Sequence, residues 1–438
     1  MNAELPVRVV QDPSRSFTDL PDEVAEGPDI TVCLDVLAGE RIRARLYGPA
    51  VPSVYGTEHR VDLTARPAEV RAAAARLCRL WKELLIGFTP PEDGRPAVEY
   101  PYASLVDLRS RPPGEQYEIV EELALTGEQL LFGTLLGGPD PRVHRFCTYL
   151  AKALSAREGL RVRFDSELYL PWPMVCLRPE DVPVPTRALS SNQDPTALYP
   201  RFLGHRHQIE QTGGAYPWLS GRGEVPDVPA VSLNHDERLD RKGQTRAAEV
   251  AALLAKNTHF VERTTRAELR RALLDAELHE HLMYFWCHGH FTPNGAHPPS
   301  LALRLTDPTA TVDAHTVREC RGQPGDGNPF QPFVLLNACH AGVPAEGGDP
   351  AFLGGALIQA GARGILGPQI EMPQVFAAEY ALEFLTRYLR GSQTAGEITR
   401  DVTRHFADDR HNPLGFAYAL HCGMDARLER AERAEPSA

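Results

Sequence analysis

Two side chains with reactive chemistry each follow a strongly apolar run of the sequence. His288 comes directly after LMYFWC, and Cys339 comes directly after FVLLNA. A cysteine thiol with an ordinary pKa of about 8.5 is mostly protonated at neutral pH, so it needs a base before it attacks a carbonyl carbon. An imidazole beside the thiol accepts that proton and later returns it to the leaving amine. The pair therefore predicts Cys339 as a nucleophile and His288 as its general base.

The segments around these residues predict the sheet that would bring them together. From about residue 229 onward, apolar strand-like runs alternate with amphipathic helical stretches. This alternation is typical of an α/β fold with a mainly parallel sheet covered by helices on both faces. The runs Leu282–Trp286 and Phe333–Leu336 should be central, with functional loops beyond their carboxyl ends. Two or three helices are expected near the end, over 373–391, 394–407 and 412–420.

The first half of the chain has a less regular α+β pattern. Alternation with a glycine turn predicts a hairpin over 30–48, and helical spacing predicts helices over 66–87 and 141–156. Residues 178–231 are dense in Pro, Gly, Ser and Asp, which favours a long connector. The predicted units are an N-terminal α+β half (1–177), a Pro/Gly-rich connector (178–228), a catalytic domain (229–425) and a polar tail (426–438).

The spacing of His288 and Cys339 and the sequence motifs of the second half resemble those of a known family. Cys339 follows His288 by 51 residues, close to the spacing of about 50 residues in caspases. The string Asn337-Ala338-Cys339-His340-Ala341-Gly342 is similar in kind to the caspase pattern around the nucleophile. The ordered segments HLMYFWCHGHF, PPSLALRLTD, PFVLLNACHAG and GGALIQAGARGILGPQ resemble the CHAT family of caspase-like peptidases, relatives of separase. The earlier segment LYLPWPMVCL resembles that family's N-terminal half, although Pro173 stands where the family usually has Glu.

The resemblance implies a caspase-like cysteine endopeptidase that hydrolyses a peptide bond through a thioester. It implies that His288 and Cys339 form the dyad and that the backbone N–H groups of Gly289 and Cys339 stabilise the oxyanion. It implies no metal and no organic cofactor. Family members often act in bacterial antiviral defence or programmed death, where a trigger releases them to cut one partner protein. A protein substrate and an activating partner or ligand are therefore expected.

Other interpretations of the same residues remain open at this point. Cys287 alternates with His288 along a strand, so packing on the opposite face is its expected role. His290 and His340 are expected at the rim, where they touch substrate or solvent. Glu346, Asp349 and Glu371 follow strand ends, and an acidic residue in the pocket would favour Lys or Arg before the scissile bond; solvated loops are the alternative.

Two quite different roles compete with catalysis. One is zinc binding, because Cys and His side chains can ligate zinc and five of them lie here: Cys287, His288, His290, Cys339 and His340. The usual spacings of Cys and His ligands are absent, however. A caspase-like scaffold or sensor that recruits a partner without cutting it is the alternative function. The long first half, in which no catalytic pattern is evident, favours it.

The amino-acid composition argues against some kinds of binding partner and location. The net charge of −12 argues against direct nucleic-acid binding, because phosphate recognition needs concentrated Lys and Arg. No signal pattern and no long apolar run is found, so no membrane association and a cytoplasmic location are expected. The eight cysteines are scattered without a CxxC pair, as is typical of reduced thiols.

Overall fold

The computed structural model describes residues 27–52, 59–87, 104–182, 194–213, 227–294, 297–307, 310–322, 329–338 and 353–428, with the backbone alone for 291–294 and 297–300. The main-sheet strands that lie before residue 213 are β1 (Ile30–Leu37), β2 (Arg41–Tyr47), β3 (His59–Asp62), β4 (Arg161–Ser166) and β5 (Gln208–Thr212). The later ones are β6 (Ala230–His235), β7 (His259–Arg263), β8 (Leu282–Trp286), β12 (Phe333–Asn337), β13 (Gly364–Pro368) and β14 (Tyr418–His421).

A smaller sheet and the helices complete the described part of the chain. The small sheet contains β9 (His288–Asn294), β10 (His297–Arg304) and β11 (Thr311–Asp313). The helices are α1 (Pro67–Trp81), α2 (Pro113–Glu128), α3 (Pro141–Ser155), α4 (Leu203–Arg206), α5 (Ala247–Ala255), α6 (Arg266–Leu274), α7 (Ala314–Arg321), α8 (Leu353–Gln359), α9 (Gln374–Tyr388) and α10 (Ala395–Arg404).

The main strands form one continuous sheet. Their order is β3-β2-β1-β4-β5-β14-β13-β12-β8-β6-β7. β6, β7, β8, β12 and β13 are mutually parallel. β14 is antiparallel to β13 but parallel to β5, so β1, β4, β5 and β14 run in the opposite direction. The prediction of a mainly parallel sheet is confirmed, and β8 and β12 are central neighbours.

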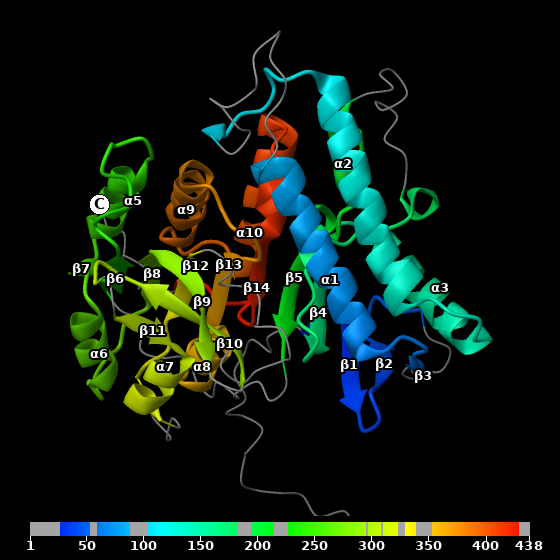
Figure 1. The fold of residues 1–438 in the computed structure, drawn as a ribbon, viewed down its shortest axis with the longest axis horizontal. Coiled ribbons are helices and arrows are strands. Elements are labelled where there is room, and N and C mark those ends of the chain that lie inside the picture. The colour runs from blue at the N-terminus through cyan, green and yellow to red at the C-terminus, as the bar shows by residue number, and fades with distance from the viewer. Residues whose placement is uncertain are drawn as a thin grey trace, which may run out of the picture.

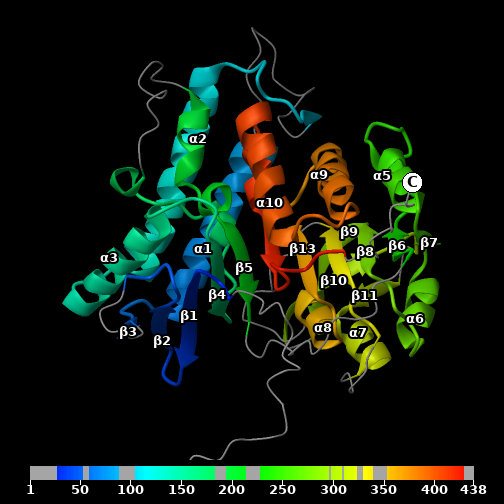
Figure 2. The same cartoon turned by 180° about the vertical axis from the view of Figure 1, so that it is seen from behind.

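Alternating side chains divide the second half into layers. Leu282, Tyr284 and Trp286 of β8 pack in the larger apolar cluster with residues of α5, α9 and α10, whereas Met283 and Phe285 pack with residues of α6, α7 and α8. Successive side chains on a strand point to opposite faces, so each face receives its own helical layer. α5, α9 and α10 accordingly lie on one side of these strands and α6, α7 and α8 on the other (Figures 1 and 2).

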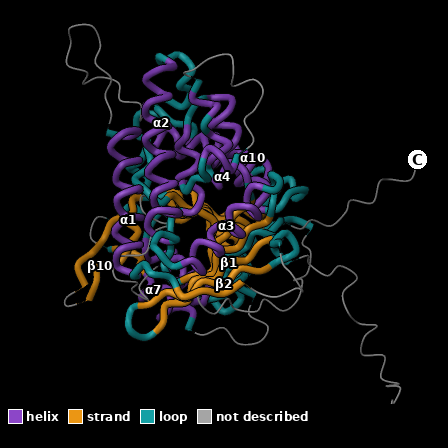
Figure 3. Tube along the Cα trace, turned by 90° about the vertical axis from the view of Figure 1, so that its right-hand side faces the viewer, coloured by secondary structure: helices purple, strands orange, loops and turns teal. Residues whose placement is uncertain are grey.

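The first half of the sheet is covered differently. α1 and α2 lie on one side of its strands, together with α10 (Figure 3). The inward residues of β2 are buried between exposed or half-buried ones, which is the alternation expected of a strand with one covered face. The other face carries ion pairs between neighbouring strands, such as Arg43 with Asp62 and Arg163 with Glu210.

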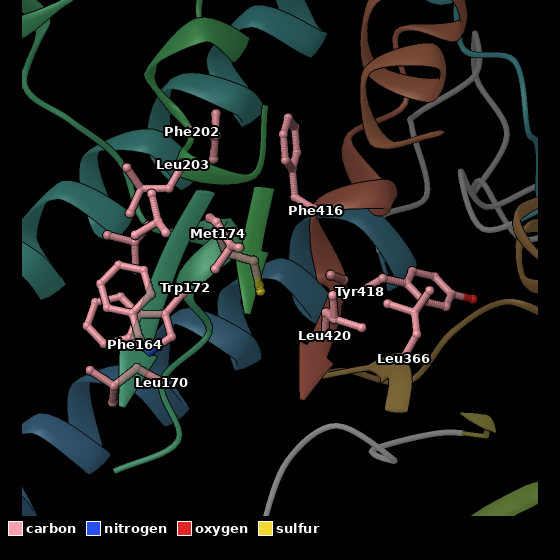
Figure 4. Close-up of a cluster of buried hydrophobic side chains, with 14 of the residues drawn as sticks. Phe164, Leu170, Trp172, Met174, Phe202, Leu203, Leu366, Phe416, Tyr418 and Leu420 are labelled. Atoms are coloured by element: carbon pink, nitrogen blue, oxygen red, sulfur yellow. The ribbon is translucent and has the colours of Figure 1, made fainter. Parts of the chain in front are cut away.

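The two halves share one apolar core at their junction. Figure 4 shows one cluster of buried side chains that includes Phe164 of β4 and Trp172 from the first half and Leu366, Phe416, Tyr418 and Leu420 from the second. The rings of Phe164 and Trp172 stack with centroids 3.6 Å apart, and Phe202 stacks on Phe416 at 4.7 Å. The Pro-Trp segment that resembled the family's first half is therefore a buried structural element.

Two elements differ from the sequence-based expectations. The predicted helix over 412–420 is wrong: a 3₁₀ turn at Pro413–Ala417 leads into β14. The segment Tyr418–His421 is too short to form a stable helix alone, and ladder partners on both sides favour the extended form.

The predicted connector also contains β5, which pairs with β4 and β14 inside the sheet, so that stretch is not a mere surface excursion. The domain boundaries stay a prediction.

Candidate active site

The carboxyl ends of three parallel strands meet where His288 lies. β8 pairs with β12 up to Trp286 and Asn337, and β6 pairs with β8 up to His235 and Trp286. His288 is two residues beyond Trp286, and Cys339 is two residues beyond Asn337. Cys339 and His340 themselves lie outside the described residues. The two residues thus follow directly paired positions of neighbouring strands at equal distances along the chain.

A buried carboxylate that the sequence analysis did not single out lies beside His288. Asp236 follows β6, its side chain is fully buried, and its backbone N–H donates to the carbonyl oxygen of Trp286 at 3.0 Å. The Arg238 guanidinium donates to both carboxylate oxygens, at 2.8 and 2.7 Å, and the Arg238 backbone N–H donates at 2.9 Å. These bonds fix Asp236 at the end of its strand and stabilise its negative charge.

The charges around His288 set its protonation. Burial lowers the pKa of His288 from its ordinary value, the Asp236 carboxylate opposes that change, and Arg304 and Arg238 lower the pKa further. Burial alone would raise the pKa of Asp236, but its bonds from Arg238 lower it, so the carboxylate stays ionised at neutral pH. A His288 pKa below its ordinary value keeps the imidazole neutral near pH 7, which is the form that accepts a thiol proton.

A matched pair of variants tests this electrostatic arrangement. Asp236→Asn removes the charge that raises the His288 pKa, so the acid limb of the pH profile of kcat/KM should move to lower pH. Arg238→Gln removes a charge that lowers the His288 pKa, so the same limb should move to higher pH. The measurement is kcat/KM against pH for one peptide substrate. Shifts in the same direction for both variants would contradict the assigned roles.

The end of β12 is held by a buried amide. The Asn337 side chain donates to the Ala377 carbonyl oxygen at 2.7 Å and to the Tyr284 hydroxyl at 3.2 Å, and it accepts from the Tyr418 hydroxyl at 2.7 Å. These partners belong to α9, β8 and β14. Three directed bonds therefore fix the end of β12 two residues before Cys339 in the sequence.

The chain from His288 onward forms a hairpin of β9 and β10. Gly289 pairs with Leu303 across β9 and β10, while His288 pairs with Arg304 and His290 pairs with Ala302. His290 is half-buried, and its Nδ1 atom is buried without a hydrogen-bond partner in the described structure. Cys287 is buried in the apolar cluster that contains Met283 and Phe285, so its predicted packing role is confirmed.

Of the three acidic residues predicted to line the substrate pocket, the structure describes one. Glu371 follows β13 and forms an ion pair with Lys82, which lies in the π-helical turn after α1. Glu346 and Asp349 lie outside the described residues. Within the described ranges, no group of three or more His, Cys, Asp or Glu side chains is arranged to hold a metal ion. None of the described helices is long and apolar enough to cross a membrane.

Comparisons with known proteins connect this geometry to a family. A family model described as "CHAT domain" matches residues 184–421. Over 138 residues the chain is 29% identical to a protein of Vitiosangium sp. (strain GDMCC 1.1324) named a "probable protease", and the match covers 32% of this chain and 18% of that protein.

Two crystal structures of the Saccharomyces cerevisiae separase–securin complex are similar at 8% and 7% identity, with TM-scores of 0.44 and 0.43. Each of those matches covers 90% of this chain and 30% of the other. The chain thus spans less than a third of the length of each of these proteins.

Proposed function

Because this chain belongs to the CHAT domain family, we propose that it is a cysteine endopeptidase that cuts a partner protein with Cys339 and His288. The observation that supports this most is the register of β6, β8 and β12, whose carboxyl ends bring Asp236, His288 and Ala338, the residue before Cys339, to the same end of the sheet. In this proposal Asp236 orients His288 and does not touch the substrate.

The proposed reaction follows the chemistry of these groups. Neutral His288 accepts the proton of the Cys339 thiol as the sulfur attacks the substrate carbonyl carbon. The resulting imidazolium gives that proton to the amine as the C–N bond breaks, leaving a thioester on Cys339. Water then attacks the thioester carbonyl carbon while His288 takes its proton. The C–S bond breaks, the acid leaves, and His288 returns the proton to the Cys339 sulfur. Backbone N–H groups of Gly289 and Cys339 are the proposed donors to the oxyanion.

The family resemblance also supports a biological role and a mode of regulation. A role in bacterial defence or programmed death would place the enzyme under a trigger, with one protein as its principal substrate. An untriggered enzyme would show little activity on arbitrary proteins. The test must therefore distinguish an inactive state from a protein that never cuts.

The test compares the wild type with Cys339→Ala on a pool of native lysate proteins and sequences every new N-terminus. New termini that share a residue preference and require Cys339 would support the peptidase. If none is found, a thiol-reactive peptide probe separates the alternatives. Labelling of Cys339 after addition of lysate or partner proteins indicates a latent enzyme. A Cys339 that never labels, in a chain that still binds its partner, would support the scaffold instead.

A further inference from the structure

The described charges around His288 leave one cation uncompensated. Asp236 and Arg238 neutralise each other through two short hydrogen bonds. The side chain of Arg304, directly opposite His288 across β9 and β10, has no hydrogen bond or ion pair in the described structure, and its Nε atom is buried. Residues paired across an antiparallel ladder project to the same face, so the guanidinium shares the face of the imidazole. Among the described residues of the site, the Arg304 guanidinium is therefore a positive charge without an ion-pair partner near the general base.

A second unsatisfied group lies on the same face. His290 is two residues beyond His288, so its side chain points to the same side of the hairpin. Its Nδ1 atom and the Nε atom of Arg304 are both buried without a partner in the described ranges. Buried polar groups of native proteins are nearly always hydrogen-bonded, and leaving one unpaired is costly. Two such groups on one face of the hairpin, at diagonal positions of the β9–β10 ladder, indicate a place for a ligand with acceptor oxygens.

We propose that Arg304, assisted by His290, binds the carboxylate of an Asp or Glu side chain of the protein substrate within two residues of the scissile bond. A guanidinium matches a carboxylate with two parallel N–H···O bonds, which gives both affinity and orientation. The inference rests on the proposed peptidase function and names the substrate class of that site. Its preference is opposite to that of the acidic pocket predicted from Glu346, Asp349 and Glu371.

The chain that leaves Arg304 leads to a second basic surface. Leu305 accepts a hydrogen bond from Arg238 at 3.0 Å, and Asp307 accepts one from the backbone N–H of Arg266 at 2.8 Å. A groove of about 580 Å³ begins there, and its lining includes the side chains of Arg266, Arg270 and Arg271 against the single carboxylate of Asp307. In a chain whose net charge is −12, a local excess of arginine favours an acidic segment of the substrate.

A different role for Arg304 makes a different prediction. If the guanidinium only adjusts His288, its removal raises the His288 pKa and moves the acid limb of the pH profile equally for every substrate. If it binds a substrate carboxylate, its removal changes the ratio of rates or affinities between acidic and neutral substrates. The ratio, rather than the absolute activity, is therefore the decisive readout.

The test uses fluorescein-labelled ten-residue peptide pools that are random except for a fixed central Glu or a fixed central Gln. Anisotropy titrations of the full chain carrying Cys339→Ala measure binding without turnover. We expect the Glu pool to bind at least about 10-fold tighter, as one charge-assisted contact allows. Adding Arg304→Gln, which preserves most of the side-chain volume, should bring the ratio to about 1. Adding Arg142→Ala, at a side chain that is 80% exposed, should leave the ratio unchanged.

The outcomes separate this inference from the proposed function. Equal binding of the two pools, or a Glu preference that persists with Arg304→Gln, overturns the role of Arg304. Wild-type cleavage that requires Cys339 but shows no acidic preference overturns it as well, while the peptidase stands. Selective binding of the Glu pool by a protein whose Cys339 neither cuts nor labels would retain the carboxylate site and remove the peptidase.

Discussion

Replacing His288 with Asn should lower kcat/KM by between about 10² and 10⁴-fold, the usual contribution of a positioned general base. Asparagine fills a similar volume but cannot accept the thiol proton. The Cys339 thiol would then ionise without assistance near its ordinary pKa of about 8.5, so the remaining activity should rise steeply between about pH 7 and 9. The measurement is kcat/KM against pH on a peptide derived from a mapped cleavage site.

A histidine far from the site provides the control. The His315 side chain is 78% exposed on α7 and pairs only with Glu319 in the described structure. His315→Asn removes one imidazole with the same change of side chain, so its pH profile should follow that of the wild type. An His288→Asn enzyme that stayed within about threefold of the wild type would remove this residue from the role of general base.

Replacing Asn337 with Ala should be the most destabilising single change near the site. It removes three hydrogen bonds and leaves the Tyr284 and Tyr418 hydroxyls and the Ala377 carbonyl buried without this partner. Each buried group that loses its partner costs about 1–3 kcal/mol, so the free energy of unfolding should fall by about 3 kcal/mol or more. Denaturant unfolding monitored by circular dichroism measures this loss.

A smaller deletion within the same network provides the comparison. Tyr418→Phe removes only the hydroxyl that donates to Asn337 and keeps the ring stacked on Tyr380, whose centroid is 3.6 Å away. The expected loss is about 1 kcal/mol. Equal losses for the two variants would show that the amide network contributes no more than a single bond. An Asn337→Ala protein as stable as the wild type would contradict the network altogether.

The sequence predicted the parts of the fold whose pattern is local. Leu282–Trp286 and Phe333–Leu336 are continuous apolar runs, and runs of this kind are typical of strands buried on both faces. Their central, neighbouring positions are confirmed. β14 was predicted as helix because a short apolar run has no decisive period of its own. β5 was missed because its polar sequence, QIEQT, stands inside a Pro- and Gly-rich stretch.

The surroundings of the proposed dyad could not be predicted in the same way. Asp236 and Arg304 lie 52 and 16 residues away from His288 in the sequence and become its neighbours only through strand pairing. One signal for Asp236 was available, since it directly follows a strand-like run, AVSLNH. Arg304 gave no such signal: an arginine at the end of PSLALR has the pattern of an ordinary solvated residue.

The direction reversal between β13 and β14 has a practical consequence for handling this protein. β5 lies near the middle of the chain, and β14 lies near the end of the described part, yet the two are neighbours in one sheet. Division of the chain between 213 and 227 would leave each fragment with a newly unpaired strand, β5 on one and β14 on the other. Exposed strand edges of this kind promote aggregation. Co-expression of complementary fragments is therefore a better route than purification of an isolated catalytic half.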